Sequence, residues 1–175
     1  MRTILAIFLF AASACAQGAP PAKATAAVGV CSTLPNTIFE VKTENGEHAA
    51  QPTAGKALVY FLQDDTRYLE HPRPTTRLAV DGAWVGATHS DSYFYVSVEP
   101  GEHHLCANWQ GGGLQPVVAV AAAHFTAVAG HSYYFRAQNS SVKDGGKTIE
   151  FAQVDSDEGQ LLVNRYAFSS SSVKK

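Results

Sequence analysis

Residues Arg77–Leu105 read RLAVDGAWVGATHSDSYFYVSVEPGEHHL, and this stretch decides the fold. Asp81-Gly82 is a two-residue turn in which the glycine accepts a positive φ, so it predicts a tight hairpin. Tyr93 to Val98 carries the aromatic and β-branched residues that suit a pleated strand. Pro100-Gly101 predicts a further reversal, after which His103 onward runs back antiparallel. The stretch therefore predicts a ladder of antiparallel hairpins.

Strand-like segments continue on both sides of this ladder. Ala57–Gln63 is an almost continuous apolar run of strand length, which is typical of a central strand in a sandwich. Val117–Phe125, Ser132–Ala137 and Thr148–Val154 are further candidates, because β-branched and aromatic residues favour extension. We therefore expect an all-β, antiparallel β-sandwich of immunoglobulin-like or transthyretin-like shape with about eight strands. A closed barrel is the alternative.

The C-terminal segment carries a helix signal followed by a polar tail. Asp155 is a capping residue with Glu158 three positions later, which predicts the start of a short helix whose apolar side chains dock on the sheet. A last strand is the alternative for this segment. Ser169–Lys175 is polar and is expected to be disordered. These boundaries place one sandwich domain at residues 37–168.

Size and composition limit the classes of protein to consider. With 175 residues and 18.6 kDa, the chain allows one domain with a real core. Charged residues make up 16%, the formal net charge is -2, and no run of either sign occurs. Nucleic acid and anionic lipid are therefore poor candidates as partners.

The N-terminus has the features of a secretory signal sequence. Arg2 precedes an apolar run from Ile4 to Ala12, and small residues follow up to Ala14. This run is too short to cross a hydrocarbon core of about 30 Å, so a transmembrane anchor is the weaker interpretation. We expect residues 1–16 to be the leader and residues 17–36, rich in alanine and proline, to be a flexible spacer.

Two processing routes compete at the end of this leader. Ala12-Ser13-Ala14-Cys15 resembles a bacterial lipobox, in which the cysteine is lipidated and becomes the mature N-terminus. The box begins with Ala12, where leucine is usual. Ordinary cleavage after Ala14 or after Ala16 is the alternative, because small residues occupy the required positions. Lipidation of Cys15 is thus one prediction of the sequence.

Either route leaves Cys31 and Cys106 as the remaining pair of cysteines. An oxidising compartment favours disulfides, and a bridge between residues 75 positions apart stabilises by roughly 4 kcal/mol on the loop-entropy model. We predict this disulfide. The alternative is a buried free thiol at Cys106 and a surface thiol at Cys31.

Two short motifs contain reactive residue types, and neither predicts a site. His103, His104 and Cys106 have the spacing of zinc or copper ligands, but adjacent strand residues point to opposite faces, so His103 cannot join the other two. His89-Ser90-Asp91-Ser92 has hydrolase residue types, but chain neighbours cannot form a nucleophile, base and orienter relay. We predict no catalytic, cofactor-binding or metal-binding residue, and hence no enzyme.

The order of several motifs resembles the bacterial DUF2846 family, a domain of unknown function. The resemblance covers about residues 55–163 and implies an exported or lipid-anchored envelope protein without implying any activity. The motifs that carry it are GKALVYF (Gly55–Phe61), VDGAWVG (Val80–Gly86), SYFYVSVEPGEHHL (Ser92–Leu105), AGHSYYF (Ala129–Phe135) and VDSDEG (Val154–Gly159).

These observations lead to one expectation and one alternative for function. We expect a non-catalytic, exported β-sandwich that acts as an interaction or structural module in the cell envelope, free in the periplasm or tethered to a membrane through Cys15. Its partner would be an envelope protein or polymer. The alternative is a periplasmic module that binds a small ligand or glycan through exposed aromatics and the Gly111–Gly113 loop. Its candidate aromatics are Tyr93, Phe94, Tyr95, Tyr133, Tyr134 and Phe135.

Overall fold

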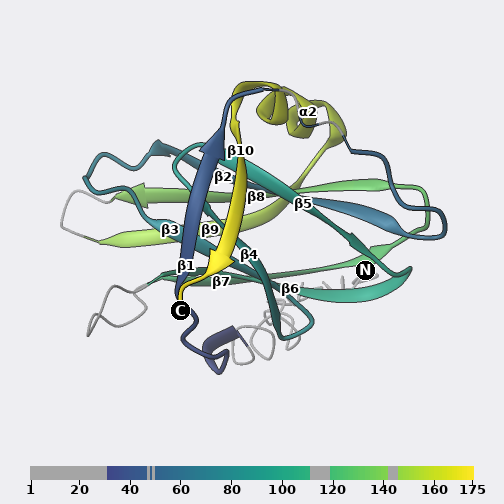
Figure 1. Cartoon of the computed structure of the whole chain (residues 1–175), viewed down its shortest axis with the longest axis horizontal. Helices are drawn as coiled ribbons and strands as arrows, with labels where there is room; N and C mark the ends of the chain where they lie inside the picture. The colour runs from purple at the N-terminus through teal and green to yellow at the C-terminus, as the bar shows by residue number, and fades with distance from the viewer. Residues whose placement is uncertain (1–30, 47, 49, 111–118, 142–145) are drawn as a thin grey trace, which may run out of the picture.

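The computed structural model describes residues 31–46, 48, 50–110, 119–141 and 146–175, and they form a sandwich of two β-sheets with one helix (Figure 1). The all-β sandwich is confirmed. The described residues contain ten strands where about eight were expected. The predicted leader, Cys15 and the Gly111–Gly113 loop lie outside these residues. The elements are β1 (Phe39–Glu44), β2 (Ala57–Arg67), β3 (Thr75–Val80), β4 (Ala83–His89), β5 (Ser92–Val98), β6 (Gly101–Trp109), β7 (Val120–Ala127), β8 (Ser132–Ser141), β9 (Lys147–Val154), α2 (Ser156–Arg165) and β10 (Ala167–Val173).

The two sheets are unequal, and the larger one is mixed rather than antiparallel. The six-stranded sheet has the order β1-β10-β5-β2-β8-β9, and the four-stranded sheet has the order β4-β3-β6-β7. β2 pairs with β8 in parallel, and β10 pairs with β5 in parallel. Parallel neighbours require long connections. Here the chain builds the whole four-stranded sheet between β2 and β8, which supplies that connection.

The predicted ladder of hairpins is correct at Asp81-Gly82 and wrong from β5 onward, because β5 and β6 lie in different sheets. β3 and β4 form the predicted hairpin, with Gly82 at φ +81° in the turn. β5 then leaves for the six-stranded sheet, where it pairs with β2, and β6 returns to the four-stranded sheet beside β3. The Pro100-Gly101 turn therefore carries the chain between the layers. A turn motif specifies that the chain reverses, but it does not specify which strand lies alongside.

β2 is the central strand, as predicted, and both of its faces are buried. Ala57, Val59 and Phe61 point into the core between the two sheets. Leu58, Tyr60 and Leu62 point to the opposite face, where apolar residues of α2 and β10 cover them. Side chains alternate between faces along a strand, so a strand covered on both sides is apolar without interruption.

The aromatic side chains that were candidates for an exposed face are covered. Tyr93 is 0% exposed and Tyr134 is 8% exposed, and both pack with Tyr60 beneath α2. Phe94 and Phe135 belong to the core between the sheets, while Tyr95 and Tyr133 are half-buried. Within the described residues, no aromatic side chain is among the exposed large apolar residues. Of the six candidate rings, only Tyr95 and Tyr133 therefore remain partly accessible for stacking.

The C-terminal segment contains both the helix and the last strand that the sequence offered as alternatives. Asp155 caps α2, and its carboxylate accepts a hydrogen bond of 2.8 Å from the Glu158 amide. The expected disorder of Ser169–Lys175 is wrong, because β10 runs to Val173 and pairs with β1 along its length. Ser169 is buried and donates to the Ser92 hydroxyl at 2.8 Å. Composition suggested a solvated tail, whereas backbone pairing and the ring of Phe168 hold this segment in the sheet.

None of the helices in the described part of the chain has the length and apolar character needed to cross a membrane.

Gly159 provides a test of how closely α2 packs on the sheet. A Cβ added there would lie 2.2 Å from Cγ of Tyr134, whose ring belongs to the cluster beneath the helix. Glycine to alanine in an exposed helix normally stabilises by about 1 kcal/mol. We predict the opposite sign for Gly159→Ala, a loss of about 1–3 kcal/mol in the free energy of unfolding, because the helix must move off the sheet.

Urea unfolding followed by circular dichroism measures this change. Asn164→Ala, at an exposed position of the same helix, is the control and should be nearly neutral. A Gly159→Ala protein as stable as the parent would show that the helix does not need this close approach.

Candidate functional site

A short N-terminal segment, Cys31–Thr37, lies across the outer face of the four-stranded sheet, and we call it the strap. Cys31 forms the predicted disulfide with Cys106 of β6, with the two Cα atoms 5.5 Å apart. The Asn108 amide donates to the Cys31 carbonyl at 3.0 Å, and the Trp84 indole donates to the Pro35 carbonyl at 2.8 Å. The predicted spacer of residues 17–36 is therefore too long, because the packed domain already begins at Cys31.

Arg77 of β3 is buried beneath the strap without a carboxylate. It is 1% exposed and is the bulkiest of the fully buried side chains described. Its guanidinium donates to neutral acceptors, Oδ1 of Asn36 at 3.0 Å and the carbonyls of Thr37 and Trp109 at 2.9 and 3.3 Å. Burial lowers the pKa of Arg77, although arginine stays charged in proteins. A buried cation is costly unless it is hydrogen-bonded, so these bonds fix the strap to the sheet.

A hollow of about 200 Å³ lies beside Arg77, between the strap and the sheet. Arg77 and Asn108 line it, and they are cross-strand neighbours in the register of β3 and β6. Nε of Arg77 and Oδ1 of Asn108 are buried and have no hydrogen-bond partner among the residues that the structure describes. A bridging water satisfies a donor and an acceptor placed this way. The hollow is therefore polar and large enough to hold water.

The inner face of β2 changes from apolar to polar beyond Phe61, and this change forms a buried hydrogen-bond network between the sheets. Nε2 of Gln63 donates to both oxygens of Asp65, at 3.0 and 2.9 Å. Asn139 donates to Asp65 at 2.7 Å and accepts at 2.7 Å from the Trp109 indole. Gln63, Asp65 and Asn139 are each 0% exposed. A solute cannot reach this carboxylate in the folded protein, so the network serves the fold.

Asp64 and Asp65 are chain neighbours on opposite faces of β2, and their pKa values shift in opposite directions. Burial tends to raise the pKa of Asp64, but hydrogen bonds from Thr66 and Gln138, together with the Arg136 cation, outweigh it and lower this pKa. Burial also acts on Asp65, and there it prevails over the hydrogen bonds from the network, so its pKa is raised.

The His89-Ser90-Asp91-Ser92 motif does not assemble a catalytic relay. Nδ1 of His89 lies 3.2 Å from the Thr75 hydroxyl, and the Ser92 hydroxyl donates to the His89 carbonyl. The Asp91 carboxylate accepts from the Asp65 amide at 2.8 Å and pairs with Arg73 at 3.1 Å. Each side chain stabilises the corner between β4 and β5.

The His103, His104 and Cys106 motif is also divided by the structure. Cys106 is in the disulfide, and His103 points inward, with its ring centroid 5.6 Å from that of Phe125. Nδ1 of His103 lies 2.7 Å from a carboxylate oxygen of Asp81, and Nε2 lies 2.7 Å from the carbonyl oxygen of Glu99. Burial opposes charge on this ring, but the two oxygens outweigh it and raise the pKa of His103. His104 points outward and is exposed.

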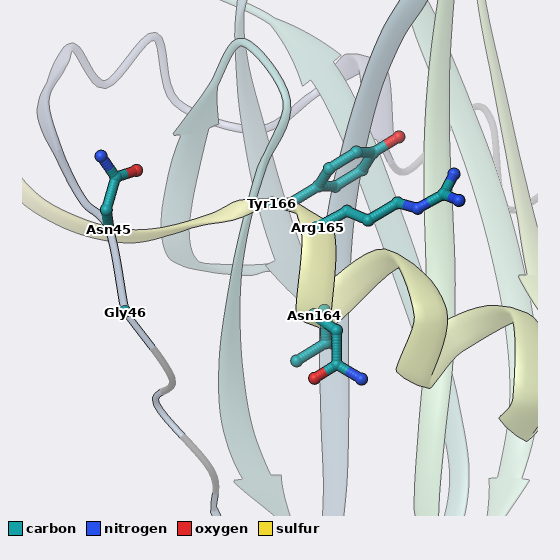
Figure 2. A pocket seen from close by; sticks show the side chains of 6 residues that line it. Asn45, Gly46, Asn164, Arg165 and Tyr166 are labelled. Atoms are coloured by element: carbon teal, nitrogen blue, oxygen red, sulfur yellow. The ribbon is translucent and has the colours of Figure 1, made fainter.

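A polar pocket of about 380 Å³ lies where α2 turns into β10 (Figure 2). Asn45 and Gly46, which follow β1, form one wall, and Asn164, Arg165 and Tyr166 of the turn form the other. Arg165 is exposed and forms no ion pair with any residue that the structure describes. Burial and the charges of Asp64 and Asp91 raise the pKa of Tyr166, so its hydroxyl stays protonated. Figure 2 shows the side chains of Arg165 and Tyr166 pointing away from Asn45 and Gly46, so the guanidinium lies beside the pocket while the polar groups of Asn45 and Asn164 are in its walls.

Sequence reasoning missed this pocket because it depends on distant segments. Asn45 and Arg165 become neighbours only because β10 pairs with β1. The polar character of Ser169–Lys175 had excluded that pairing. Neither wall carries a motif of its own.

A family model described as "Protein of unknown function (DUF2846)" matches residues 53–148, just over half of the chain. The matched region runs from the approach to β2 into the start of β9. The VDSDEG motif and α2 lie beyond it. No curated protein matches this chain.

The opposite pKa shifts of Asp64 and Asp65 predict opposite effects on the pH dependence of stability. Asp64, with a lowered pKa, contributes stability above its ordinary pKa of about 4, and this contribution is lost as the pH falls through the native value. Asp65, with a raised pKa, opposes folding increasingly as the pH rises from about 4. Asp64→Asn should therefore flatten the rise of stability with pH, and Asp65→Asn should steepen it.

Urea unfolding free energies of the parent and both variants, measured from about pH 3 to 7, provide the comparison. If the two slopes change in the same direction, the two carboxylates do not have the environments described.

Proposed function

Because this chain belongs to the DUF2846 family of proteins of unknown function, we propose its role from its architecture: a non-catalytic, exported envelope module that binds a partner at its α2 end. The observation that carries this proposal is the placement of the strap and the pocket at opposite ends of the domain. The proposal has two parts, the compartment and the binding surface, and each has its own support.

The disulfide supports export. Disulfides persist in oxidising compartments such as the bacterial periplasm and are rare where thiols are kept reduced. The Cys31–Cys106 bridge joins the strap to the sheet, directly after the expected leader and spacer. Export by the leader, followed by lipidation at Cys15 or by ordinary cleavage, supplies that compartment. In either case, the chain that precedes the domain joins it at the strap.

The geometry of β1 supports a binding surface at the far end. The strap leads into Phe39 at one end of β1, and Asn45 follows its other end at Glu44. Six extended residues span about 20 Å. Figure 1 shows α2 at the opposite end of the domain from the strap and the C-terminus. A domain tethered through its N-terminus therefore presents the pocket away from the tether.

The chemistry of the pocket indicates the kind of partner. The exposed guanidinium of Arg165 beside the pocket and the amides of Asn45 and Asn164 in its walls favour a surface that supplies carboxylates or carbonyl oxygens. An envelope protein or an envelope polymer can present both groups.

A small polar ligand or a glycan fragment is the second candidate for the same pocket. Its volume of about 380 Å³ falls within the range of about 300–1,000 Å³ that is usual for ligand sites. Recognition would depend mainly on hydrogen bonds, because four of the six aromatic rings that were expected to stack on a sugar are buried.

Site-specific photo-crosslinking in cells tests the binding surface. A photoreactive residue at Asn164 should give a defined cross-linked adduct. Arg165→Ser should lower the yield of that adduct at least fivefold, because the partner can no longer pair with the Arg165 guanidinium. The same probe at Val85, which is 36% exposed on the four-stranded sheet, is the matched control and should give none. Equal labelling at both positions, or labelling unaffected by Arg165→Ser, would reject the α2 end as the surface.

Mass spectrometry of the processed protein tests the compartment separately. We expect the N-terminus to begin at Cys15 with a lipid mass, or at a cleavage site between Ala14 and Gln17, and the Cys31 and Cys106 thiols to resist alkylation. An intact Met1, or alkylation of both thiols without reductant, would contradict export.

A further inference from the structure

Two histidines face each other across neighbouring strands on the outer face of the four-stranded sheet. His104 of β6 and His124 of β7 are direct partners in the register, and their ring centroids lie 6.5 Å apart. Both side chains are exposed. This pair is separate from the pocket at the α2 end and from the buried networks.

The backbone places these two side chains as close together as a sheet allows. The His104 amide donates to the Asp81 carboxylate at 2.9 Å, and its carbonyl accepts from the Asp81 amide at 2.8 Å. Both polar groups of His104 thus point toward the β3–β4 turn and away from β7. His104 and His124 therefore form a non-hydrogen-bonded pair, the type in which Cα atoms approach to about 4.5 Å and side chains lie closest.

We propose that His104 and His124 form a surface binding site for a divalent late first-row metal ion, with Cu²⁺ bound most tightly. Imidazole nitrogen is a good ligand for copper, nickel and zinc, and affinity at a given site rises to a maximum at copper. The two histidines supply two ligands, and water completes the coordination. The described residues contain no group of three or more candidate ligands, so the ion keeps open positions.

The geometry requires only a small adjustment of two exposed side chains. With a metal about 2.0–2.1 Å from one nitrogen of each ring, the ring centroids lie about 5 Å apart in tetrahedral geometry and about 4.5 Å apart at neighbouring positions of the square-planar geometry that Cu²⁺ prefers. The observed separation of 6.5 Å between the ring centroids must therefore shorten by roughly 1–2 Å, which side-chain rotations on the surface can provide. The Asp81 carboxylate, which holds the His104 amide and His103, fixes the strand beneath the site.

Copper titration of the exported, disulfide-bonded chain tests the site. The protein carries no polyhistidine tag, and every variant also carries Cys15→Ser, so that neither a tag nor a terminal thiol binds the ion. We expect one Cu²⁺ per chain by calorimetry and an electron paramagnetic resonance spectrum with splitting from two imidazole nitrogens. His104→Gln and His124→Gln should each weaken binding at least tenfold.

His131→Gln removes another exposed histidine and is the matched control, with an expected change of less than twofold. Thermal unfolding without metal verifies that the three variants fold, since all three side chains are on the surface. Loss of affinity in His131→Gln alone, unchanged binding in His104→Gln or His124→Gln, or a spectrum with one nitrogen or none would overturn the proposal.

Discussion

The structure depends on the need to cover both faces of β2. This strand carries large apolar side chains on each side, and each one buried contributes about 1.5–3 kcal/mol relative to exposure. One face requires a second sheet, which β3, β4, β6 and β7 supply. The other requires a further layer, which α2 and Phe168 supply. The sandwich and its helical cover follow from one strand that cannot face water.

The chain uses its two ends to cover the outer surfaces of the two sheets. The strap covers part of the four-stranded sheet and brings neutral acceptors to Arg77. The C-terminal segment covers the six-stranded sheet with α2 and then enters it as β10. The disulfide anchors the first of these covers, and Gly159 permits the close approach of the second.

The sequence was informative where a signal is local. Turn residues located the hairpin at Gly82, the continuous apolar run identified β2 as central, and Asp155 marked the start of α2. It was uninformative where the outcome depends on a distant partner. The serines of β10 suggested disorder because side-chain composition does not report backbone pairing with β1.

The same limit applies to the sites. The sequence placed His104 beside His103 and Cys106, whereas the register places it opposite His124, which no motif singles out. The pocket at the α2 end likewise joins Asn45 to Arg165 across most of the chain. The disulfide was predictable because elimination left a single pair of cysteines.

The position of β10 between β1 and β5 has a topological consequence. Among the described strands, β1 has no hydrogen-bonded neighbour in its sheet except β10, so this edge of the sheet assembles only after β10 has been synthesised. Once assembled, the amide of Lys174 donates to the carbonyl of Ile38 at 2.8 Å, so β10 ends beside the start of β1 and the last strand closes over the first.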